Sequence, residues 1–132
     1  MKIKIYYHHT DSGGLVYYAE YLKFLEEARS EFLEERGISI KESVKQGILF
    51  VVSRQEIDYK SPAFYGDVLE VETRLAKVSG VRIEFTYAIR NQNRQLISQA
   101  KTVLVCVDKD IKPKVIPQEI RDKIEKYGQP EK

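Results

Sequence analysis

One long helical pattern, followed by four strand-like segments, is the feature that most limits how this chain can fold. Between Val16 and Arg36, apolar side chains recur every three or four residues, as on one face of an α-helix. Gly37 follows directly, where a glycine commonly ends a helix. About 20 helical residues extend roughly 30 Å, which is long for a small domain. The recurring positions are Tyr18, Tyr21, Leu22, Leu25, Ala28, Phe32 and Leu33.

Most of the remaining chain alternates between strand patterns and short turns. A strand is expected at residues 2–7, and Pro117–Ile124 predicts a short terminal helix with proline in its first turn. The turns at Ser79-Gly80 and Asn91–Arg94 are so short that the last three strands must be antiparallel neighbours. The four strands expected after the long helix are Ile48–Tyr59, Val68–Leu75, Val81–Ile89 and Leu96–Val107.

This element order predicts an α+β fold, with one long helix against a curved antiparallel sheet of five strands, in a single domain over residues 1–132. A chain of 132 residues is long enough to bury one hydrophobic core. Strict alternation places Leu69, Val71, Thr73 and Leu75 on one face of their strand. The other sheet face and the strand edges are then partly free for a partner chain.

Charge and composition exclude several classes of function. The 22 basic and 20 acidic residues give a net charge of +2, too balanced to predict a nucleic-acid partner. The apolar run Ile48–Val52 is far too short for a membrane span. The residues after Met1 lack the apolar core of a signal peptide, and Cys106 is the single cysteine, so no internal disulfide is possible. We therefore expect a cytoplasmic protein.

The segment of residues 8–18, HHTDSGGLVYY, holds the candidate functional residues. His8, His9 and Asp11 suggest a metal site, but adjacent side chains on an extended strand point to opposite faces. With no further histidine and no cysteine pair, a complete ligand set is hard to assemble. The sequence therefore predicts no metal site.

Asp11 permits two interpretations. It is a typical turn residue, since aspartate, serine and glycine favour tight turns. It also places a carboxylate just ahead of the expected helix, whose first N–H groups have no partners within the helix. Those amides, at residues 16–18, would stabilise an oxyanion. A carboxylate that acts as base or nucleophile, together with a site that stabilises an oxyanion, is the smallest set of groups needed to hydrolyse an ester or thioester.

The neighbouring residues are ambiguous in the same way. Gly13 and Gly14 are either simple turn glycines or positions where the backbone approaches a substrate closely. Tyr17, Tyr18 and Tyr21 are either packing residues or the lining of a pocket.

Three segments resemble the 4-hydroxybenzoyl-CoA thioesterase/YbgC-like family. The first, Thr10-Asp-Ser-Gly-Gly-Leu-Val-Tyr-Tyr-Ala-Glu-Tyr21, is similar to the family pattern T-D-x-x-G-x-V-Y-x-x-x-Y before a long helix. Asp58-Tyr-Lys-Ser-Pro-Ala-Phe-Tyr-Gly-Asp67 resembles the family's loop between strands two and three. Val103-Leu-Val-Cys-Val-Asp108, with Lys112-Pro113 and Ile116-Pro117, resembles the C-terminal part of YbgC-like chains. The resemblance covers nearly all of the first 120 residues.

The resemblance implies a hot-dog fold and hydrolysis of acyl-CoA thioesters without a metal or other cofactor. By matching position, Asp11 would be the catalytic base or nucleophile, and the backbone N–H of Tyr18 would polarise the thioester carbonyl. Gly14, Val16 and Tyr17 would line the substrate site. At the place where the family holds CoA phosphates, this chain has only Lys77 and Arg82. Active sites at the dimer interface imply at least a homodimer, and we expect a homotetramer of paired dimers.

Other classes of function remain open from the sequence. The same fold also suits a non-catalytic module that binds acyl-CoA or acyl carrier protein, because fold does not fix chemistry. A scaffold or interaction protein is a third possibility, with acyl carrier protein as a candidate partner. A screen for acyl-CoA hydrolysis separates the enzyme from the binding module.

Overall fold

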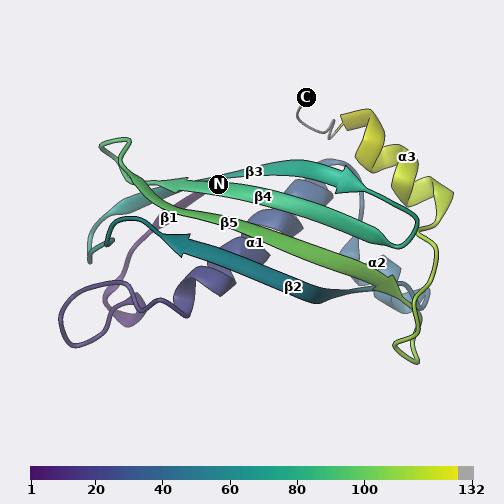
Figure 1. Cartoon of the computed structure of the whole chain (residues 1–132), viewed down its shortest axis with the longest axis horizontal. Helices are drawn as coiled ribbons and strands as arrows, with labels where there is room; N and C mark the ends of the chain where they lie inside the picture. The colour runs from purple at the N-terminus through teal and green to yellow at the C-terminus, as the bar shows by residue number, and fades with distance from the viewer. Residues whose placement is uncertain (128–132) are drawn as a thin grey trace.

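The computed structural model describes residues 1–127, and within them it shows a five-stranded antiparallel sheet curled around a long helix (Figure 1). The strands lie in the order β1-β3-β4-β5-β2, so β1 and β2 form the two edges. The elements are β1 (Lys2–Lys4), the 3-10 turn η1 (Tyr7–His9), α1 (Glu20–Glu35), α2 (Ile40–Lys45), β2 (Leu49–Tyr59), β3 (Val68–Val78), β4 (Arg82–Arg90), β5 (Leu96–Val107) and α3 (Gln118–Tyr127).

The core lies between α1 and one face of the sheet. The predicted alternation in β3 is confirmed, since Leu69, Val71 and Leu75 are buried while their neighbours along the strand are exposed or half-buried. Most of the predicted apolar face of α1 is buried against these strands, but Tyr18 and Leu22 are exposed. The buried helix residues are Tyr21, Phe24, Leu25, Ala28, Phe32 and Leu33.

Gly37 ends α1 as predicted. It has a φ of +79°, a left-handed conformation that favours glycine. The N–H of Gly37 donates to the carbonyl of Glu34, and the N–H of Ile38 donates to the carbonyl of Leu33, both at 3.0 Å. This pair of bonds is the Schellman arrangement, and Ile38 is buried behind it.

The predicted start of the helix at Val16 is wrong, because α1 begins at Glu20. The N–H of Val16 donates to the carbonyl of Ala63 at 2.9 Å, and the N–H of Tyr17 donates to the carbonyl of His9 at 3.0 Å. These partners lie in other loops, and they hold residues 16 and 17 in an irregular segment before the first helical turn.

The N-terminal strand is also shorter than predicted. β1 ends at Lys4, and the chain then enters η1 instead of continuing as a strand to residue 7. A capping hydrogen bond stabilises this turn, since the N–H of Tyr6 donates to Nδ1 of His9 at 2.9 Å.

Helix α2 was not predicted. It is only six residues long, and Ser39 caps it by accepting the N–H of Glu42 at 3.1 Å. The serine and glutamate three residues apart are the available sequence signal for this helix. The remaining predicted strands and the terminal helix are present; β5 has the predicted ends, and the ends of the others differ by at most three residues. No helix among the described residues is long and apolar enough to cross a membrane.

Candidate active site

Asp11 organises a tight loop through its own carboxylate. Its Oδ1 accepts the N–H groups of Gly13 at 2.9 Å and Leu15 at 3.3 Å. The Asp11 N–H donates to the Leu15 carbonyl, and Gly14 closes the loop with a φ of +79°. No hydrogen bond occupies Oδ2 within the described part of the chain. The turn interpretation of Asp11 is therefore confirmed, and one carboxylate oxygen is left for other chemistry.

A second aspartate in the chain builds nearly the same loop. Oδ1 of Asp108 accepts the N–H groups of Asp110 at 2.8 Å and Lys112 at 3.1 Å, and Ile111 adopts the left-handed φ of 62°. The loop shape of Asp11 is thus a general turn geometry, which argues neither for nor against catalysis. What separates the two loops is their surroundings, since the Asp11 loop leads directly into the segment that ends at Tyr18.

The Tyr18 segment presents free backbone amides. Within the described residues, no acceptor takes the N–H of Tyr18 or of Ala19. Tyr18 lies two residues before the first residue of α1, so its amide belongs to the turn before the helix and not to the helix itself. Because the preceding amides of Val16 and Tyr17 are already bound to other loops, the segment is held in place while the next N–H groups stay available.

An open cavity of about 290 Å³ adjoins this segment. Of the residues that the sequence assigned to the site, Tyr18 and Val16 line this cavity, whereas Asp11, Gly14 and Tyr17 do not. The cavity has an aromatic wall that the sequence did not assign as a site, apart from the ambiguous Tyr21. Its lining residues are Leu15, Val16, Tyr18, Tyr21, Tyr59, Lys60, Ser61 and Pro62.

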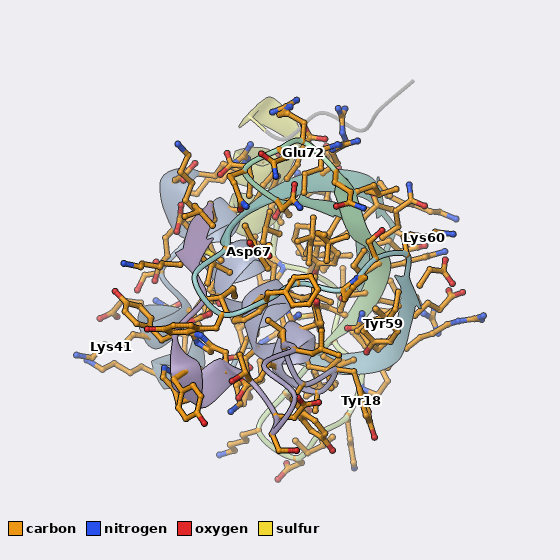
Figure 2. The ribbon with its side chains drawn as sticks, turned by 90° about the vertical axis from the view of Figure 1, so that its left-hand side faces the viewer. Tyr18, Lys41, Tyr59, Lys60, Asp67 and Glu72 are labelled. Carbon is orange, nitrogen blue, oxygen red and sulfur yellow. The ribbon has the colours of Figure 1, made fainter. Side chains whose placement is uncertain are left out.

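Tyr59 and Lys60 are among the cavity-lining residues that the sequence did not assign to a site. They lie where β2 ends, on the same side of the molecule as Tyr18 (Figure 2). The ring of Tyr59 meets that of Tyr18 at 6.3 Å and that of Tyr21 at 5.4 Å, both edge to face. The available signal was the motif Asp58–Asp67, which contains both residues.

The phenol of Tyr21, which lines the cavity, gives the stability of the fold a measurable pH dependence. Burial, with smaller contributions from Tyr59 and Asp67, raises the pKa of Tyr21 to about 12, from an ordinary value of 10.0. Below pH 10 the phenol is protonated in both folded and unfolded chains. Above pH 10 it ionises only in the unfolded chain, so the free energy of unfolding falls between pH 10 and 12, by about 2–3 kcal/mol.

Denaturant unfolding at several pH values checks this expectation against Tyr21→Phe. The wild type should lose stability more steeply than the variant between pH 10 and 12. Equal slopes would show that Tyr21 does not remain protonated in the folded chain.

His8 and His9 do not point to opposite faces, as an extended strand would require. Because η1 replaces the strand, their rings lie side by side, with centroids 4.0 Å apart. His9 packs edge to face on Phe24, and its pKa is lowered by burial and by the neighbouring His8. The alternation argument was therefore wrong. Among the described residues, no group of three or more His, Cys, Asp or Glu side chains is placed to hold a metal ion.

Lys77 and Arg82 lie at the other end of the sheet from the Asp11 loop within one chain. Arg82 pairs with Val105, which in turn pairs with Val51 near the start of β2, whereas Tyr59 ends β2. Eight residues of strand, from 51 to 59, correspond to roughly 25 Å. The structure therefore brings Tyr18, Val16 and the Asp11 loop into one region, and it leaves Lys77 and Arg82 apart from them.

Comparison with known proteins identifies the family. Residues 7–124 match the family model of the thioesterase-like superfamily. The chain belongs to this superfamily. Acyl-CoA thioester hydrolase YbgC of Escherichia coli O6:H1 is 35% identical over 119 residues, covering 89% of both chains. Acyl-CoA thioesterase YbgC of Haemophilus influenzae is 36% identical over 121 residues, covering 90% of this chain and 88% of the relative.

A solved structure supports the fold of this superfamily member. The 1,4-dihydroxy-2-naphthoyl-CoA thioesterase from Synechocystis aligns with a TM-score of 0.89 and 26% sequence identity, covering 98% of this chain and 97% of the other. The expected hot-dog fold is confirmed, and so is the expected enzyme class, a thioester hydrolase.

Proposed function

We propose that this protein hydrolyses acyl-CoA thioesters, with Asp11 as the acid–base or nucleophilic group and the Tyr18 N–H as the oxyanion donor. The observation that carries the proposal is the Tyr18 N–H, which has no acceptor within the described residues. It lies beside a cavity, and the chain leads to it from the Asp11 loop through only two residues, Val16 and Tyr17. YbgC relatives with acyl-CoA in their names support the choice of substrate class.

The proposed chemistry uses the two groups in sequence. Asp11 takes a proton from a water molecule while the oxygen of that water attacks the thioester carbonyl carbon. The developing oxyanion accepts a hydrogen bond from the Tyr18 N–H. The carbon–sulfur bond then breaks, the proton passes to the departing thiolate, and free acid and CoA are the products. If Asp11 attacks directly, an acyl-aspartyl anhydride forms and water then hydrolyses it. Both routes need a carboxylate with a free oxygen, which Oδ2 supplies.

The neighbouring residues have supporting roles in this proposal. Gly14 lets the loop close because its φ of +79° is a left-handed conformation that other residues rarely adopt; space is not the reason, since a Cβ there would meet no atom within 4 Å. Val16 and Tyr17 precede the Tyr18 donor, and their own N–H groups are bound to the carbonyls of Ala63 and His9. The acyl group would occupy the aromatic cavity at Tyr18.

We also propose that two chains pair through β2 to complete the site. β2 is an eleven-residue strand whose outer edge is unpaired among the described residues, and such edges are rarely left open. Antiparallel pairing about a two-fold axis places the start of one β2 beside the end of the other. The partner's sheet would then bring its Arg82 end toward this site, and Lys77 and Arg82 would reach CoA phosphates from there.

Sedimentation tests the assembly. We expect a dimer at micromolar concentration, with a homotetramer as the larger form. A monomer at that concentration would contradict both the shared site and the role of Lys77 and Arg82.

A binding module for acyl-CoA or acyl carrier protein is the alternative function on the same fold. A panel of acyl-CoA thioesters of different chain length, assayed with the wild type and with Asp11→Asn, separates the two. Turnover that depends on Asp11 supports the enzyme, whereas binding without turnover would support the module. We propose that the protein is cytoplasmic, because CoA thioesters occur there and a single cysteine stays reduced there.

A further inference from the structure

Tyr59 makes a long-range contact with the segment that presents the Tyr18 amide. Its hydroxyl donates a hydrogen bond of 3.2 Å to the backbone carbonyl of Tyr18, across 41 residues of sequence. Figure 2 shows the two side chains next to each other at one side of the molecule. The bond joins the end of β2 to the turn before α1.

This turn is weakly fixed by its own hydrogen bonds. Ala19 occupies the cap position of α1 and offers no capping side chain. The N–H groups of Glu20, Tyr21 and Leu22 donate to carbonyls three residues earlier, at 2.9, 3.3 and 3.2 Å. The last two distances are at the long limit for an N–H···O bond. Since an uncapped helix start is less stable, an external contact has more influence here.

The other end of the contact is rigid. Ser98, which is buried in β5, donates through its hydroxyl to the carbonyl of Asp58 at 2.9 Å. The N–H groups of Lys60 and Ser61 both donate to the carbonyl of Ile97, at 2.9 and 3.1 Å. The backbone on each side of Tyr59 is therefore bound to β5, which holds the Tyr59 backbone in place, while its side chain is half exposed and packs against the rings of Tyr18 and Tyr21.

We propose that Tyr59 is a positioning residue for thioester hydrolysis: its hydroxyl holds the carbonyl end of Tyr18, which limits rotation of the backbone at Tyr18 and so keeps the Tyr18 N–H, one peptide plane earlier, aimed at the developing oxyanion. The inference rests on the function proposed above for Asp11 and Tyr18. Donors of this kind stabilise a transition state only when they are oriented in advance. Partial burial, with a smaller contribution from Tyr18, raises the pKa of Tyr59 above its ordinary value of 10.0, and a phenol is already protonated and able to donate at neutral pH.

The test is Tyr59→Phe, which removes the hydroxyl and keeps the ring. We expect kcat for acyl-CoA hydrolysis to fall about three- to tenfold, the factor that one neutral hydrogen bond supplies, with KM changed less than about twofold. Tyr65→Phe is the matched control. Tyr65 is exposed, its ring meets Tyr7, and its hydroxyl has no partner within the described residues, so kcat and KM should stay at wild-type values.

The split between kcat and KM separates positioning from wall contact. A rise in KM with unchanged kcat would overturn the proposal, because Tyr59 would then act only as a wall of the cavity. Unchanged values of both would overturn it as well.

Backbone amide chemical shifts of the free protein supply a readout that needs no substrate. In Tyr59→Phe, the amide signals of Tyr18 and Ala19 should shift relative to the wild type, because the hydrogen bond to the Tyr18 carbonyl is lost, while the signals of β4 stay unchanged. Identical Tyr18 signals in both proteins would overturn the proposal even if kcat fell. Wild-type activity in Asp11→Asn would instead refute the proposed function, and the chemical-shift result would still stand by itself.

Discussion

Replacing Asp11 with asparagine is expected to give a folded protein whose thioester hydrolysis is slower by about 10²–10⁴-fold, the typical contribution of a positioned acid–base group. Asparagine retains an Oδ1 that accepts the N–H groups of Gly13 and Leu15, so the loop can keep its shape. It cannot take a proton from water or attack a carbonyl as a carboxylate does. Steady-state rates on the thioester panel measure the loss.

Asp108→Asn is the matched control for this experiment. Its carboxylate makes the same two backbone bonds, to Asp110 and Lys112, but in a loop after β5 that is not part of the proposed site. Asp108→Asn should hydrolyse thioesters at the wild-type rate and show about the same change in melting temperature as Asp11→Asn. Full activity in Asp11→Asn would leave Asp11 with a turn role only.

The largest effect on stability is expected for Phe85→Ala. Phe85 has no exposed surface and packs edge to face on Phe32 of α1, with ring centroids 5.4 Å apart. Truncating a buried phenylalanine costs about 3–5 kcal/mol, because apolar contacts are lost and the cavity left behind collapses only in part. Denaturant unfolding should show a lower midpoint with an unchanged slope.

Two variants of the same strand give the comparison. Phe85→Leu keeps most of the volume and should cost clearly less than the alanine change. Glu84→Ala removes a half-buried ion pair with Lys101, of 3.1 Å, on the opposite face, and should cost less than Phe85→Ala because it leaves no cavity in the core. A loss below about 1 kcal/mol for Phe85→Ala would mean that α1 does not pack on the sheet as described.

The sequence predicted the sheet well because its information there is local. Alternation with a period of two places Leu69 and Ile83 inward whatever the rest of the chain does, and short turns leave no choice but antiparallel pairing. Gly37 is equally local, since only its own φ and the last turn of α1 decide where the helix ends.

The candidate site was only partly predictable because its geometry depends on distant partners. Periodicity extended the helix back to Val16, but the carbonyls of Ala63 and His9 take the amides that a helix would need. Strand alternation separated His8 from His9, but η1 brings their rings together. Neither the motif nor its spacing indicated that Tyr59 would hydrogen-bond the Tyr18 carbonyl.

By itself, the sequence determined the α+β class, the order of the strands along the chain and Asp11 as the residue to examine. These follow from periodicity, turn length and residue type, which act over a few positions. Tertiary structure alone decided where α1 starts, which amides remain free and which side chains surround them. Those features depend on hydrogen bonds between segments about 8 to 47 residues apart, whose pairing exists only once the sheet has closed around the helix.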